Sequence, residues 1–245
     1  MRILLLADIH ANWTALRQVN EPHDVCFFLG DLVDYGLEPV PCIEWVQRRA
    51  HYSVRGNHDH AVAQRAATNG RNGFKYLSGE TRQVTWQLLG PDHLRFLGSL
   101  PVTRRVTLGG VRFLLVHATP RDPLDEYASD DPEFWSQRLQ YVDADVICVG
   151  HTHQSYALHV DGKLEINPGS IGQPRDGDPR ASYAVWDNGQ VELKRLAYPV
   201  EEVVQQFHDS RLPELAQRLS IEVLRTGASG AVETARALTQ LQASS

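Results

Sequence analysis

Side chains that can bind metal ions follow five short segments of the sequence. Each segment alone is a weak signal, because an exposed Asp-x-His pair is common in loops. Five of them together make chance a poor explanation and predict one site assembled from strand ends. The segments are ADIH (Asp8, His10), GDLVDYG (Asp31, Asp34), GNHD (Asn57, His58, Asp59), VHA (His117) and GHTH (His151, His153).

The types of these side chains indicate which ions the site would hold. Imidazoles, carboxylates and one amide are present without a thiolate, which disfavours a structural zinc cluster. Seven such groups suffice for two ions about 4 Å apart if one carboxylate bridges them, and Asp31 is the natural bridge. We therefore expect two divalent metal ions, with Mn²⁺ favoured and Fe, Zn, Co or Ni as alternatives, since all of these accept nitrogen and oxygen ligands.

Three apolar runs in the first third of the chain would position the first of these groups. Residues 3–7, 25–30 and 52–56 are continuous apolar runs of the kind that form buried parallel strands. Helical patterns at 12–20 and 39–50 separate them, the first opening at Asn12, a good N-cap residue. In βαβ order the carboxyl ends of the strands meet at one edge, so the groups that follow them should converge.

The rest of the chain indicates a second sheet and outer helices. Tight-turn dipeptides at 109–110, 161–162 and 188–189 predict three hairpins, and a helical region covers about 80–98. Beyond Pro199 three segments have helical spacing, the last at 231–242. We expect a parallel half followed by an antiparallel half, packed as two sheets with helices outside, which is a mixed α/β (α+β) fold.

Composition limits the class of protein. The 245 residues, with 42% hydrophobic and 22% charged, fit a single domain over 1–245 with a helical C-terminal region at about 200–245. The net charge of −6 gives no general attraction for nucleic acid or an anionic membrane. Three cysteines without CxxC spacing favour a reducing, cytoplasmic location. The N-terminal segment is interpreted as a strand, and no apolar stretch approaches membrane-spanning length.

With its five segments in this order, the chain resembles the calcineurin-like metallophosphoesterase superfamily. The family pattern DxH, GDxxD, GNH[DE], H and GHxH is matched without a gap from Asp8 to His153. The resemblance implies a two-sheet β-sandwich flanked by helices, in four layers (α/β/β/α). Residues 167–187, NPGSIGQPRDGDPRASYAVWD, look more narrowly like the small prokaryotic phosphodiesterases of this superfamily.

The resemblance also implies a role for each matched residue. His58 would be the acid that helps the leaving oxygen depart, and Asp59 would orient His58 by accepting a ring N–H. Asp34 would support the site from just outside the ligand set. The metal ligands would be Asp8, His10 and His153 for the first ion, Asn57, His117 and His151 for the second, and Asp31 for both.

The function that follows is a dinuclear metal-dependent phosphoesterase. We expect a phosphodiesterase that hydrolyses a small phosphodiester or nucleotide by attack of a metal-bridging hydroxide, without stable binding of nucleic acid or a membrane. One alternative is a phosphoprotein phosphatase or a dinucleoside polyphosphate hydrolase; the first is disfavoured because the only arginine soon after GNHD is Arg65. Another is a non-catalytic metal-binding scaffold, although such proteins typically lose the position of His58 or a metal ligand.

A few polar residues outside the five segments allow more than one role. Arg175 and Arg180 could contact a phosphate or form ion pairs with neighbouring aspartates. Asn167 is expected to shape a turn first and contact substrate second. His60 is expected to face solvent at the start of a helix, and the loop 121–130 is expected near the pocket.

Overall fold

The computed structural model describes residues 1–230 apart from 69 and 71, together with residue 232. The strands are β1 Arg2–Leu6, β2 Val25–Phe28, β3 Tyr52–Ser53, β4 Thr103–Leu108, β5 Val111–Val116, β6 Val146–Cys148, β7 Ser155–Val160, β8 Lys163–Pro168, β9 Ala181–Asp187 and β10 Gln190–Leu196. The helices are α1 Trp13–Leu16, α2 Pro39–Arg49, α3 Asn57–Ala63, α4 Gly73–Leu88, α5 Pro91–Ser99, α6 Pro132–Leu139, α7 Val200–Asp209 and α8 Glu214–Thr226.

The strands form two five-stranded sheets, ordered β10-β9-β1-β2-β3 and β4-β5-β6-β8-β7. In the first sheet β1, β2 and β3 are parallel, and β9 runs antiparallel to β1 with Leu4 opposite Val185. In the second, β5, β6 and β8 are parallel, and β4 and β7 are antiparallel edges. The expected division into a parallel half and an antiparallel half is therefore wrong, because both sheets mix the two kinds of pairing.

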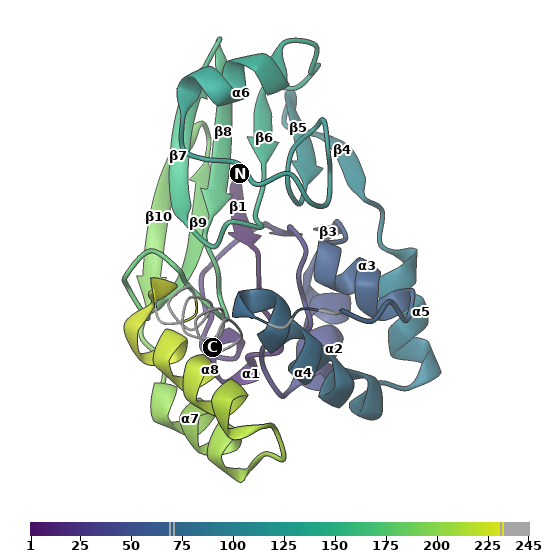
Figure 1. Ribbon diagram of the computed structural model, residues 1–245. Helices are drawn as coiled ribbons and strands as arrows, with labels where there is room; N and C mark the ends of the chain where they lie inside the picture. Colours follow the sequence, from purple (N-terminus) through teal and green to yellow (C-terminus); the bar gives the residue numbers. More distant parts are fainter. Residues whose placement is uncertain (69, 71, 231, 233–245) are drawn as a thin grey trace, which may run out of the picture.

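The sheets pack face to face and helices cover their outer faces (Figure 1). Residues 3 and 5 of β1 point between the sheets, toward Phe113 and Ile166 of the second sheet. Their neighbours 4 and 6 pack on the opposite side against α2, α7 and α8. Both faces of β1 are thus buried, which explains its unbroken apolar sequence. Trp135 of α6 covers the outer face of the second sheet and completes four layers, as the resemblance implied.

The predicted turns are confirmed, and the first helix begins where predicted but already ends at Leu16. At each of the three hairpin dipeptides both central residues have positive φ, as a two-residue turn between twisted strands requires. The Asn12 side chain accepts a hydrogen bond from the backbone of Ala15 and caps α1. The helical middle begins earlier than predicted, at Gly73, and the predicted helical segment at 231–242 lies outside the described residues apart from Val232.

The three cysteines belong to the core of the protein. Cys26, Cys42 and Cys148 are buried free thiols, and burial raises the pKa of Cys26 to about 12. They act as small core side chains. Over the described part of the chain, no helix is long and apolar enough to cross a membrane.

Candidate metal centre and active site

The predicted ligands come from two sheets that end at the same place. Asp8 follows β1, Asp31 follows β2 and Asn57 begins α3 after β3. His117 follows β5, and the loop after β6 carries His151 and His153. Because the parallel strands of both sheets direct their carboxyl ends toward one edge, residues up to 145 positions apart form one cluster.

The loops that carry these groups have unusual backbone conformations. Five of the seven predicted ligands have φ between 45° and 70°, namely Asp8, His10, Asp31, His151 and His153. This left-handed region costs roughly 1–2 kcal/mol for each residue with a side chain, so the surrounding structure must hold it. Such strain concentrated at one place is typical of a functional site.

Two glycines allow the loops to approach closely enough. A Cβ atom at Gly30 would lie 2.6 Å from the backbone nitrogen of Gly56 and 2.7 Å from Nδ1 of His117. A Cβ atom at Gly56 would lie 2.1 Å from Oδ1 of Asp31. Any larger residue at either position would push the loops after β2 and β3 apart, and with them Asp31 and Asn57.

The potential ligand atoms fall into two groups that share Asp31. Asp8, His10, Asp31 and His153 form one group, and Asp31, His117 and His151 the other, with the atoms of each group within 4.8 Å of one another. Nε2 of His10 lies 3.1 Å from Nε2 of His153, and Nε2 of His117 lies 3.2 Å from Oδ2 of Asp31. This arrangement suits two neighbouring cations joined by one carboxylate.

Backbone carbonyls orient three of the histidines. Nδ1 of His10 contacts the carbonyl of Val33 at 2.8 Å, and Nδ1 of His117 contacts that of Leu29 at 2.8 Å. Nδ1 of His153 contacts the carbonyl of Gln173 at 2.6 Å. Since a carbonyl can only accept, Nδ1 carries the proton in each ring, which leaves the lone pair on Nε2 to face the cluster.

Several buried atoms in the cluster would gain a partner from a cation. Oδ1 of Asp8 and Oδ1 of Asn57 are buried without a hydrogen-bond partner among the described residues, and Nε2 of His117 faces only the Asp31 carboxylate, at 3.2 Å. Unpaired buried polar atoms cost free energy, roughly 1–3 kcal/mol each, unless another group satisfies them. All three are ligand atoms for a divalent ion, so the residues present fit such a group.

The protonation tendencies of the cluster agree with a cation site. Burial lowers the pKa of His10 and of His153 well below the usual value, and burial lowers that of His151 to about 3, which favours the neutral rings that bind metal. For His117, burial acts in the same direction, but the charge of Asp31 prevails and raises its pKa to about 9. The negative charge of Asp31 thus favours a cation beside His117.

His58 lies beside the cluster and is oriented from behind by Asp34. Nδ1 of His58 contacts Oδ2 of Asp34 at 2.7 Å, while Nε2 lies 3.9 Å from Oδ2 of Asp31. Nε and Nη2 of Arg82, on α4, both donate to the same Asp34 oxygen at 2.9 and 2.5 Å. Burial opposes the charged ring, but Asp31 and Asp34 raise the pKa of His58.

Asp59 has a different role from the predicted one. Oδ2 accepts hydrogen bonds from the backbone nitrogens of Asp31 and Gly56, and Oδ1 accepts one from that of Leu32. The prediction that Asp59 orients His58 is therefore wrong, because Asp34 makes that contact. Asp59 instead joins the loops after β2 and β3, and so places the ligands that they carry.

The segment from Asn167 to Ser170 supports the two loops opposite. Nδ2 of Asn167 donates to the carbonyl of Gly150 at 2.8 Å and to Oγ1 of Thr152 at 3.0 Å, in the loop of His151 and His153. The hydroxyl of Ser170 donates to the carbonyl of Asp8 at 2.7 Å. The expected structural role of Asn167 is thus confirmed.

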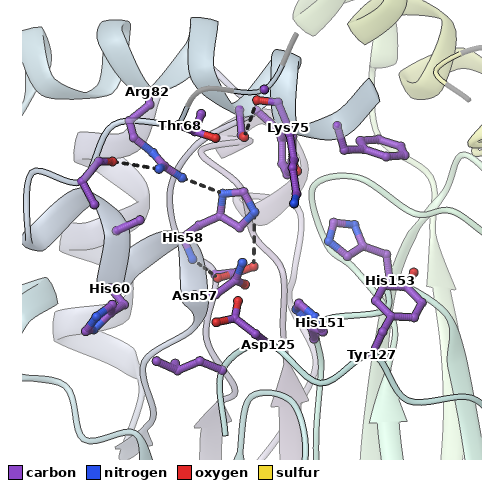
Figure 2. Close-up of a pocket in the computed structure, with 18 of the residues that line it drawn as sticks. Asn57, His58, His60, Thr68, Lys75, Arg82, Asp125, Tyr127, His151 and His153 are labelled. Atoms are coloured by element: carbon purple, nitrogen blue, oxygen red, sulfur yellow. Dashed lines mark hydrogen bonds and ion pairs between the residues drawn. The ribbon is translucent and has the colours of Figure 1, made fainter. Parts of the chain in front are cut away.

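A cavity of about 980 Å³ opens directly over the cluster. Figure 2 shows His58 between Arg82 and Asn57, with His151, His153 and Tyr127 across the cavity. The 121–130 loop reaches its wall through Leu124, Asp125 and Tyr127, as expected, and the partly exposed His60 also lines the cavity.

Sequence reasoning missed several side chains around this cavity. Arg82 and Lys75 lie on α4, and nothing in the helical pattern of that segment distinguishes them from surface cations. Phe74 also lines the cavity, and Tyr35 lies next to both His10 and His58. Only Tyr35 carried a signal, because it directly follows Asp34 in a candidate segment.

Comparison with known proteins shows which family the chain is similar to. The model of the calcineurin-like phosphoesterase superfamily domain matches residues 1–190. An uncharacterised protein from Methanocaldococcus jannaschii is 32% identical over 243 residues, covering 89% of this chain and 96% of that protein. The crystal structure of a metallophosphoesterase from Sphaerobacter thermophilus superposes with a TM-score of 0.76 at 33% identity, over 93% of this chain and 99% of the other.

A further structure shows how widely the fold extends. A hypothetical protein from Pyrococcus horikoshii is only 20% identical, yet it superposes with a TM-score of 0.77 over 93% of this chain and 99% of its own. At that identity the likeness shows the fold alone. From the family match and the relatives above 30% identity, we conclude that the chain belongs to the calcineurin-like phosphoesterase superfamily.

Proposed function

We propose that this protein hydrolyses a small phosphodiester or nucleotide with the help of two divalent metal ions. As a family member the chain is a metal-dependent phosphoester hydrolase; the preference for small diesters is our inference. The observation that carries it is the pair of ligand groups sharing Asp31, with His58 beside them at the base of an open cavity.

Seven residues would hold the ions. Asp8, His10 and His153 would bind one, Asn57, His117 and His151 the other, and Asp31 both. When bound, two divalent ions supply an activated water and offset the negative charge of a phosphoester. Asn57 contributes an oxygen without negative charge, so two ions, two carboxylates and a hydroxide leave about one net positive charge to attract the substrate.

His58 would act on the leaving group. With Nδ1–H directed at Asp34, the protonated ring presents Nε2–H on the side of Asp31 and the cavity. From there it can donate a proton to the oxygen that departs, and the Asp34 carboxylate behind the ring favours the charged form. Asp34 fixes the ring plane, and Arg82 holds Asp34 in place through two hydrogen bonds.

The cavity favours a small substrate over a phosphoprotein. Its described walls come from α3, α4 and the loops around 125, 153 and 175. Arg65, the one arginine that soon follows GNHD, lies over the Trp86 ring, 5.8 Å from its centroid, and is not among the residues that line the cavity. It is thus not placed to bind the phosphate of a phosphoserine.

The test is hydrolysis of bis(p-nitrophenyl) phosphate by protein stripped of metal and then reloaded with each divalent ion. We expect activity that follows metal content, highest with Mn²⁺, and a preference for diesters over phosphopeptides. Activity that survives complete chelation would contradict the proposal. Two bound metals with no turnover over diesters, nucleotides and dinucleoside polyphosphates would favour a binding scaffold instead.

A further inference from the structure

Arg175 is a cation in the cavity wall that forms no ion pair with an acidic side chain in the described part of the chain. Its guanidinium carbon lies 3.6 Å from the centroid of the Phe74 ring and 5.3 Å from that of Tyr35. Its Nη2 donates to Oε1 of Gln173, and its Nε is buried with no partner among the described residues. Arg180, from the same loop, is instead neutralised by Asp178 and points away as an exposed ion pair.

The Tyr35 ring connects Arg175 to the reacting centre. The centroid of Tyr35 lies 4.8 Å from that of His58 and 4.7 Å from that of His10. The Tyr35 ring therefore separates Arg175 from His58. Arg175 is too far from the cluster to take the place of a metal ligand, but a bound nucleotide can span the separation. Because His58 would face the leaving oxygen and also contacts Tyr35, Arg175 is within reach of a leaving group that extends past this ring.

The charges of the site favour a further anion beside Arg175. Two bound divalent ions would make the cluster positive, and an unpaired guanidinium next to it is then unfavourable without a counter-charge. Lys75, on α4, also lines the cavity (Figure 2) and makes no ion pair with any described residue. Arg82 does not contribute in this way, because Asp34 neutralises it.

We propose that Arg175, assisted by Lys75, binds a second phosphate of the substrate, carried by the leaving group. The proposal rests on the proposed function and specifies its substrate class: a phosphodiester whose departing part bears another phosphate, such as a phosphorylated nucleoside. The two aromatic rings hold the guanidinium plane fixed, so its N–H groups are directed before the substrate arrives.

The experiment compares the dinucleotide ApA with the same dinucleotide phosphorylated at its 5′ or its 3′ end. The products identify which nucleoside leaves, and kcat/KM should be highest for the form with the phosphate on that nucleoside. In Arg175→Gln this preference over ApA should fall by about tenfold or more. Arg175→Lys keeps the charge and should retain part of it, while Arg180→Gln serves as the matched control with the preference intact.

A second measurement does not depend on turnover. Calorimetry of metal-loaded protein should give tighter binding of adenosine 3′,5′-bisphosphate than of 5′-AMP, and Arg175→Gln should remove the difference. If the wild-type protein does not hydrolyse bis(p-nitrophenyl) phosphate at all, the proposed function is refuted. The ratio of the two nucleotide affinities would still decide the role of Arg175. An unchanged ratio in folded Arg175→Gln, an equal loss for ApA and its phosphorylated forms, or a preference for phosphate on the other nucleoside would overturn the proposal.

Discussion

Replacing Asp34 with asparagine removes the negative charge that orients the proposed acid, His58, while leaving the seven proposed metal ligands in place. The change keeps an oxygen near Nδ1 of His58 but removes the charge that contacts it at 2.7 Å. A hydrogen bond to a charged group contributes about 1.5–3 kcal/mol, which corresponds to a loss of about 10- to 150-fold if it acts in the transition state. We expect kcat to fall within this range.

The same change also weakens the fold. Arg82 is buried and loses its charged partner, and breaking a buried ion pair costs about 3–5 kcal/mol. Asparagine still accepts one hydrogen bond, so the loss of unfolding free energy should stay below that range. Activity must therefore be measured well below the melting temperature, with metal content determined on the same sample.

The assay uses leaving groups of different basicity. An acid is needed more for a departing nucleoside than for p-nitrophenolate, so Asp34→Asn should impair hydrolysis of a dinucleotide more than that of bis(p-nitrophenyl) phosphate. Asp59→Asn is the matched control, since its carboxylate contacts backbone nitrogens and should not distinguish the two substrates. Equal losses on both substrates in Asp34→Asn, or a loss explained by missing metal, would refute the reasoning.

Three further predictions concern charge at other positions. Asn57→Asp should bind metal at least as tightly but lower kcat, because the added negative charge makes the attacking water harder to deprotonate; metal titration and kinetics at several pH values would detect this. His58→Ala should keep two metal ions by elemental analysis yet lose turnover, whereas His117→Ala should lose one ion. The buried Glu165 has both carboxylate oxygens unpaired within the described structure, and burial raises its pKa well above the usual value. The folded state therefore favours protonated Glu165. The contribution of this group to the free energy of unfolding is complete below about pH 4.5 and is lost as the pH rises toward the folded pKa, by at most about 1.4 kcal/mol per pH unit. Glu165→Gln should flatten this slope in urea unfolding at pH 5 to 9, and an unchanged slope would contradict it.

The elements were predictable where the local sequence alone determines them. Apolar runs gave β1 and β2, and the turn dipeptides gave all three hairpins, because a two-residue turn with positive φ restricts the sequence strongly. The pairing of β9 with β1 was not predictable, since the two strands are about 180 residues apart and no local pattern encodes which edge a hairpin joins. The single-domain organisation over 1–245 and the cytoplasmic location stay predictions.

The ligand set could be proposed from spacing, but the support of His58 could not. Asp59 is its neighbour in sequence, yet successive residues of α3 point in directions about 100° apart, so adjacency does not bring their side chains together. Asp34 reaches His58 from another loop, 24 residues earlier, and Arg82 comes from a helix 48 residues beyond Asp34. Such contacts depend on tertiary packing, which one sequence does not display.

The pairing of β1 with β9 has a consequence for synthesis on the ribosome. Asp8 is made before Ser170 and Gly172, which hold its backbone, and β1 gains its antiparallel neighbour only when residues 181–187 appear. The nascent chain therefore exposes an unpaired edge of β1 until β9 has been made. We expect the proposed ligands to come together only after that point, and a chain cut short before β9 would carry all of them without the strand pairing that positions Asp8.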